Sequence, residues 1–139
     1  MKRHEFLKQL GFKGAALLAL YCSGACTYEH LNPQPEHIVD FTVDLSAPAN
    51  QTLADIGGFI TTNNVVIVQA TAKNFVAATL FCSHEGLPEI TFDGSRNIFS
   101  CNAHGAAYDL NGKGLNERGK NGLKIYQASL SGNSLRIFG

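Results

Sequence analysis

The stretch FVAATLFCSHEG, residues 75–86, runs from an apolar, strand-like segment straight into a cysteine, a histidine and a glycine. A second stretch repeats this order, because ITF (residues 90–92) and NIFSC (residues 97–101) lead into SCNAHG (residues 100–105). In both places a run with strand composition ends at a cysteine and then meets glycine, which favours a turn. We therefore expect the cysteines and histidines on two loops, each at the end of a strand.

Strand-like runs also dominate the sequence around these two stretches. FTVDL (residues 41–45) alternates between apolar and polar side chains, and NVVIVQATA (residues 64–72) is a run rich in β-branched residues that predicts a buried strand. LKIYQASL (residues 123–130) and SLRIF (residues 134–138) flank SGN (residues 131–133), which predicts a hairpin. No stretch after residue 30 shows sustained helical spacing. The sequence predicts an all-β fold, a small antiparallel barrel or sandwich.

Size and charge limit the classes of function. The chain has 139 residues, enough for one domain of roughly 100–150 residues. Its formal net charge is zero, but residues 27–139 carry 7 basic and 10 acidic side chains, a net charge of −3. A mildly acidic body without a basic cluster or an interleaved aromatic stripe has no electrostatic footprint for nucleic acid. We therefore exclude nucleic acid as a partner.

The N-terminal segment has the composition of an export signal. A basic start, MKRHEFLK (residues 1–8), precedes a short apolar run, GAALLALYCSGA (residues 14–25). From residue 14 to residue 26 there are only 13 residues, whereas a helix needs about 20 to cross a bilayer. We do not expect a retained transmembrane helix.

The end of this segment predicts a lipid anchor. SGAC (residues 23–26) resembles a bacterial lipoprotein cleavage box, although Ser23 stands where that box usually has leucine. Cleavage there would make Cys26 the lipidated first residue of the mature chain and would remove Cys22. The alternative is a disulfide, or two inert thiols, at these two cysteines.

Further features of the N-terminal part suggest the export route and the domain boundaries. RHEFLK (residues 3–8) resembles the twin-arginine export signal, with His4 in place of the second arginine, which leaves the general secretory route open. TYEHLNPQPEH (residues 27–37) is polar, carries two prolines and has the composition of a linker. The sequence thus predicts a signal segment over residues 1–26, a linker over 27–37 and one domain over 38–139.

The cysteines and histidines of the two loops are candidate metal ligands. Cys82, His84, Cys101 and His104 form the pattern Cys-x-His, 16 residues, Cys-x-x-His. Three interpretations fit: buried thiols and histidines without a ligand, a structural zinc site, or a centre of iron and sulfide. Zinc accepts Cys2His2 ligation, but in the usual finger each ligand pair comes from one residue type. The pattern therefore favours iron and sulfide.

At these residues the chain resembles the Rieske family, whose Cys-x-His and Cys-x-x-His boxes are separated by about this distance. The resemblance covers residues 38–139 and implies a Rieske-like fold, in which the two loops form a cluster-binding subdomain. It implies one 2Fe-2S cluster per chain, with Cys82 and Cys101 on one iron. His84 and His104 would then bind the other iron, each through one ring nitrogen.

The resemblance also implies how the cluster behaves. Neutral imidazoles in place of two thiolates leave the cluster less negative, so it accepts an electron more easily. Gly86 and Gly105 follow the two boxes. Their missing side chains would let the backbone approach the inorganic sulfide and direct N–H groups toward it. We expect a one-electron carrier of raised potential.

Several positions depart from the pattern of Rieske proteins in quinol-oxidising cytochrome complexes. Those proteins have an extra cysteine in each box, paired as a disulfide, where this chain has Leu87 and Ala103. Their serine that donates to a bridging sulfide is replaced by Ala106, whereas the tyrosine that donates to a ligand thiolate is present as Tyr108. Their proline-containing shielding loop has no counterpart in LNERGKNG (residues 115–122). The resemblance is therefore closer to a Rieske ferredoxin-like relay.

These features predict an electron-transfer protein that is not an enzyme by itself. Only 35 residues follow His104 and none is histidine, so a second, mononuclear iron site as in Rieske oxygenases is not expected. We expect single-electron transfer between redox partner proteins in the bacterial cell envelope, with the chain anchored through Cys26 and facing the periplasm. Two alternatives stay open: the iron-sulfur subunit of a quinol-oxidising complex, and a non-redox domain with a structural zinc.

Overall fold

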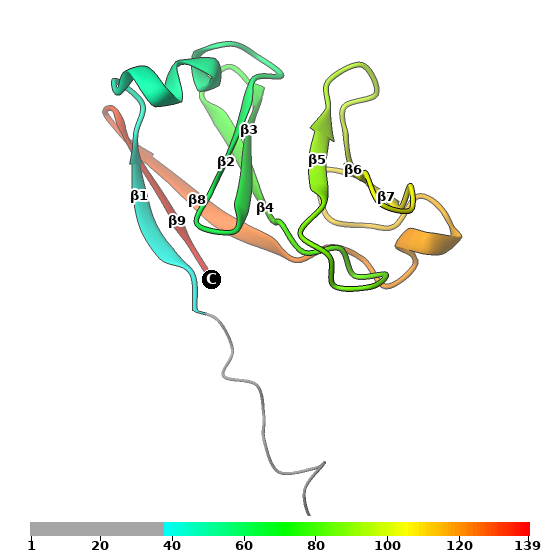
Figure 1. Ribbon diagram of the computed structural model, residues 1–139. Helices are drawn as coiled ribbons and strands as arrows, with labels where there is room; N and C mark the ends of the chain where they lie inside the picture. The colour runs from blue at the N-terminus through cyan, green and yellow to red at the C-terminus, as the bar shows by residue number, and fades with distance from the viewer. Residues whose placement is uncertain (1–37) are drawn as a thin grey trace, which may run out of the picture. The chain divides into compact units, whose positions relative to one another are not determined.

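The computed structural model describes residues 38–139 (Figure 1). The signal segment and the linker predicted for residues 1–26 and 27–37, including the lipidation site at Cys26, lie outside the described residues. Across residues 38–139, no helix is long and apolar enough to cross a membrane. The described part consists of β1 (Asp40–Asp44), η1 (Pro48–Ala54), β2 (Phe59–Thr62), β3 (Val65–Thr71), β4 (Asn74–Thr79), β5 (Ile90–Asp93), β6 (Ile98–Cys101), β7 (Ala107–Tyr108), η2 (Glu117–Gly119), β8 (Ile125–Ser131) and β9 (Ser134–Phe138), where η denotes a 3-10 helix.

The strands form two antiparallel sheets. The larger sheet has six strands in the order β1-β9-β8-β4-β3-β2, and the smaller sheet has three in the order β5-β6-β7. Figure 1 shows the three short strands beside the larger, curled sheet. The chain enters them from β4. The two halves of the larger sheet join through the pairing of Ala77 with Tyr126 and of Ala78 with Ile125. The predicted all-β antiparallel fold is confirmed.

Strand β3 lies between β2 and β4 and is buried on both faces. Its side chains alternate across the sheet, so Val65 and Ile67 enter one core while Val66 and Val68 enter the other. All four are fully buried, and burying such a side chain contributes about 1.5–3 kcal/mol. The continuous β-branched run thus follows from the position of this strand, and the prediction of a buried strand is confirmed.

The core between the two sheets supports the loops that carry the candidate ligands. Phe92 and Phe99 of the small sheet pack edge to face, with ring centroids 5.7 Å apart, against Val66 and Val68 of the large one. Cys82 and Cys101 belong to this same core. Both cysteines are therefore anchored by packing that joins the two sheets.

The hairpin predicted around residues 131–133 is present. β8 pairs with β9 in register, and the two-residue connection contains Gly132 at φ 59°. A second hairpin joins β2 to β3 through Asn63 and Asn64, at φ 49° and 62°, the left-handed conformation that asparagine tolerates and that tight hairpin turns require.

Four elements were not among the predicted ones. β2 has four residues, none of them buried, and β7 has only two, so neither gives a readable alternation. η1 buries only Leu53 and η2 is a single turn, so neither has the apolar stripe by which a helix is recognised. β2 and β7 each pair with an adjacent strand, β3 and β6, and are recognised as strands only through that pairing.

Candidate metal centre

Three loops meet at one end of the small sheet. The first loop (residues 80–89) joins β4 to β5, the second loop (residues 102–106) joins β6 to β7, and the third loop (residues 109–124) joins β7 to β8. The first loop carries Cys82 and His84, the second carries His104, and Cys101 is the last residue of β6, directly before the second loop. Cys82, His84 and His104 thus lie on two loops that follow strands, as expected from the sequence, whereas Cys101 is the end of a strand.

The first and second loops contain the same turn. In the first, the Gly86 amide donates to the Cys82 carbonyl at 2.7 Å, and in the second the Gly105 amide donates to the Cys101 carbonyl at 2.9 Å. The two glycines have φ 71° and 72°, and a Cβ at either would meet no atom within 4 Å. Glycine is therefore favoured here by its left-handed backbone and not by a lack of space. The predicted approach of this backbone to the cluster stays a prediction.

A second hydrogen bond closes each turn at the cysteine. The Cys82 amide donates to the Leu87 carbonyl and the Cys101 amide donates to the Ala106 carbonyl, both at 2.8 Å. The two cysteines therefore occupy equivalent positions in two copies of one turn. Their histidines differ by one place, at the second residue after Cys82 and the third after Cys101.

The thiols and the imidazoles lie in different environments. Cys82 and Cys101 are 2% exposed and form no disulfide. The side chains of His84 and His104 are each 34% exposed, and their ring centroids lie 5.1 Å apart. The centre thus has a buried sulfur side and a nitrogen side that reaches the surface.

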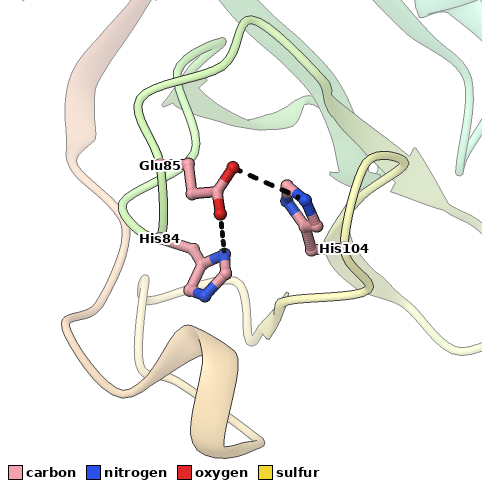
Figure 2. A group of neighbouring side chains, drawn as sticks. All are labelled: His84, Glu85 and His104. Carbon is pink, nitrogen blue, oxygen red and sulfur yellow. Dashed lines mark ion pairs between the residues drawn. The ribbon is translucent and has the colours of Figure 1, made fainter.

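The nitrogen side includes a carboxylate that the sequence did not single out. Figure 2 shows the Glu85 carboxylate facing both rings, with one oxygen directed at each. Its Oε1 lies 4.0 Å from His84 Nδ1 and its Oε2 lies 3.5 Å from His104 Nε2. The inner nitrogen of His104, Nδ1, is buried and has no hydrogen-bond partner among the described residues. A buried ring nitrogen without a partner is costly unless it binds a ligand.

The distances between the possible ligand atoms indicate whether they hold one metal ion or a centre with two. One ligand atom each of His84, Glu85 and His104 lies within 4.8 Å of the others, but neither thiol belongs to this group. Four ligands of one tetrahedral zinc would lie about 3–4 Å from one another, given bond lengths of about 2.0–2.3 Å. Two thiols on one side and two imidazoles on the other fit a centre with two metal ions better.

Tyr108 and Ser83 surround the sulfur of Cys82 with hydroxyl groups. The Tyr108 hydroxyl lies 3.4 Å from Cys82 Sγ and 2.9 Å from Ser83 Oγ. Tyr108 in β7 and Ala106 in the second loop are both fully buried. The sequence had indicated Tyr108 but not Ser83, because nothing local marks a serine whose partner lies 25 positions away in the chain.

The same contacts act on the acidity of these groups. Burial raises the pKa of the Cys82 thiol, but hydrogen bonds from the Tyr108 hydroxyl and from backbone amides of the turn outweigh it and leave the pKa below its ordinary value. Burial raises the pKa of Cys101 and also that of Tyr108. The surroundings of Cys82 therefore favour a thiolate, the form that binds metal.

The third loop holds the second loop in place through two side chains. Asn116 donates to the Gly105 carbonyl at 2.7 Å and accepts from the amides of Ala107 and Gly119 at 3.2 and 3.0 Å. Arg118 donates to the carbonyl of His104. The sequence did not single out these two side chains, because their partners lie 11 and 14 positions earlier in the chain.

We predict that Asn116→Ala loosens the second loop. The substitution removes three hydrogen bonds, one of which caps the N-terminus of η2, so the free energy of unfolding should fall by about 1–2 kcal/mol. Bound iron should also be lost faster to a chelator. The matched control is Asn111→Ala, since the Asn111 side chain makes no hydrogen bond to any residue of 38–139. Equal stability and equal iron loss in both variants would contradict this role.

A comparison with protein families decides what kind of domain this is. The family model described as Rieske [2Fe-2S] domain matches residues 43–127, from within β1 into β8, and includes all three loops. The chain belongs to the Rieske family. As a Rieske domain it binds a 2Fe-2S cluster and serves electron transfer. Among curated proteins no match was found.

The chain is also similar to solved structures. One of them is the crystal structure of the cyanobacterial plasma membrane Rieske protein PetC3 from Synechocystis PCC 6803, whose chain has 24% sequence identity to this one. The match covers 57% of this chain and 82% of that chain, with a TM-score of 0.49. The two buried thiols, the paired imidazoles and the unpartnered nitrogen of His104 form a donor set that fits the cluster.

Proposed function

We propose that this Rieske domain is a single-electron relay of the bacterial cell envelope. Cys82 and Cys101 hold one iron of the cluster, and His84 and His104 hold the other. The observation that carries the assignment is the pair of equivalent turns, which place two buried thiols on one side and two half-exposed imidazoles on the other. When bound, the cluster accepts and returns one electron at a potential raised by its neutral histidine ligands.

The exposed edge of the imidazoles is the route by which the electron enters and leaves. The cysteines are 2% exposed, so a partner protein cannot approach the sulfur side closely. The rings of His84 and His104 reach the surface and are the ligands that a docked partner can contact. The two redox partners therefore use this face in turn, one to donate and the other to accept.

The envelope location rests on the N-terminal sequence. A short apolar run that ends in SGAC supports acylation of Cys26, and several acyl chains anchor a protein stably where one does not. A relay fits this domain better than a quinol-oxidising subunit does, because Leu87 and Ala103 cannot form a loop-to-loop disulfide.

Expression of the full chain in a bacterial host tests the proposal. We expect the protein in the membrane fraction, beginning at an acylated Cys26 by mass spectrometry, coloured, and giving a reversible one-electron wave by voltammetry. Cys26→Ala should release a chain with an unchanged wave, because the anchor is separate from the cluster. Recovery of a chain that still begins at Met1 would refute export, and a colourless, zinc-loaded protein would refute the relay.

A further inference from the structure

Ser83 stands next to a predicted iron ligand without being one itself. It lies in the first loop between Cys82 and His84, and its hydroxyl is 2.9 Å from the Tyr108 hydroxyl. The Tyr108 hydroxyl in turn lies 3.4 Å from Cys82 Sγ. We propose that Ser83 is a positioning residue, which directs the Tyr108 proton onto the Cys82 sulfur and so raises the reduction potential of the cluster. This inference rests on the proposed ligand role of Cys82.

The number of protons fixes the direction of the hydrogen bonds. A cysteine bound to iron is a thiolate and has no proton to donate, whereas Tyr108 and Ser83 have one each. If Tyr108 donates to sulfur, its oxygen accepts from Ser83, and both protons are used. If Tyr108 instead donates to Ser83, the sulfur receives no hydroxyl donor, and the Ser83 proton has no acceptor among the described residues. The order Ser83 to Tyr108 to Cys82 is therefore favoured.

The surrounding packing holds this chain of hydroxyls in place. Tyr108 is fully buried in β7, and a Cβ added at Gly119 would lie 3.2 Å from its ring, so the third loop packs directly on that ring. Ser83 is held in the turn that the Gly86 amide closes on the Cys82 carbonyl. A donor that is itself an acceptor becomes polarised and donates more strongly, so Ser83 strengthens the bond to sulfur without touching it.

A double-mutant cycle measured by voltammetry tests the proposal. Ser83→Ala should lower the equilibrium constant for reduction about fivefold, as expected for one neutral hydrogen bond, or about 40 mV for one electron. Ser83→Thr keeps the hydroxyl and should recover most of the difference. In a Tyr108→Phe background the same Ser83→Ala change should have less than a third of its effect, because the link to sulfur is already absent. Ser46→Ala is the control, since the Ser46 hydroxyl bonds Asp44 in an exposed turn.

Two readouts separate the outcomes. Iron and sulfide content is measured first, because a chain without a 2Fe-2S cluster would overturn the proposed function and this inference together. With the cluster present, an unchanged potential in Ser83→Ala, or an equal fall in both backgrounds, would overturn the inference alone. Iron–sulfur stretching bands in resonance Raman spectra should also move to higher frequency in Ser83→Ala, because a weaker hydrogen bond leaves more electron density for the iron–sulfur bond. Unmoved bands would contradict the role.

Discussion

Cys101→Ser is expected to abolish the 2Fe-2S cluster, which is the largest effect predicted for this protein, and Cys82→Ser is expected to do the same. A serine hydroxyl is a far poorer ligand for iron and sulfide than a thiolate, and each cysteine is one of two on its iron. Both cysteines are 2% exposed and belong to the core that joins the two sheets, so the loss also affects the fold. Metal binding and folding are coupled when loops depend on the centre. We expect the unfolding midpoint to fall by at least about 10 °C relative to the loaded parent.

The visible absorption spectrum and the iron and sulfide content measure this prediction. The matched control is Ala103→Ser, which adds a hydroxyl to an exposed position two residues after Cys101 in the same turn. It should keep the full cluster and nearly the parental midpoint. A normal 2Fe-2S spectrum in either cysteine variant would refute the ligand assignment.

Tyr108→Phe is expected to lower the reduction potential by about 60–130 mV. The Tyr108 hydroxyl lies 3.4 Å from Cys82 Sγ, and a donor directed at sulfur stabilises the more negative, reduced cluster. A hydrogen bond to a charged group is worth about 1.5–3 kcal/mol. A tenfold change in the equilibrium constant for reduction, about 1.4 kcal/mol, corresponds to about 59 mV for one electron. Phenylalanine keeps the buried ring and removes only the hydroxyl, so packing is largely preserved.

Voltammetry of parent and variants at one pH decides whether Tyr108 tunes the cluster or only packs. Tyr126→Phe is the control, because its ring packs against the core on the far face of the sheet, and its potential should stay unchanged. Ala106→Ser adds a hydroxyl at a fully buried position of the second loop and should raise the potential if that hydroxyl points inward. A shift below about 20 mV in Tyr108→Phe, well under the charge-assisted estimate, would assign the ring to packing alone.

The fold could be predicted wherever the information is local. The run of residues 65–68 is apolar at consecutive positions because both faces of β3 are buried there, and that run is visible in the sequence. The turn at residues 131–133 is visible for a similar reason, since glycine between two alternating segments is a hairpin signal. β2 and β7 could not be predicted, because segments of four and two residues are too short to show an alternation and become strands only when a neighbouring strand supplies hydrogen-bond partners.

The sequence by itself determined the all-β class, the two loops and the four candidate ligands, because strand alternation, glycine and the Cys/His spacing are properties of neighbouring residues. Only the tertiary structure decided that both loops are the same turn, that the thiols are buried and the imidazoles exposed, and that Ser83, Glu85 and Asn116 belong to the site. Ser83 and Asn116 contact partners 25 and 11 positions away, and burial depends on how two sheets pack. Such contacts form only when the folded chain brings distant segments together, so no local pattern encodes them.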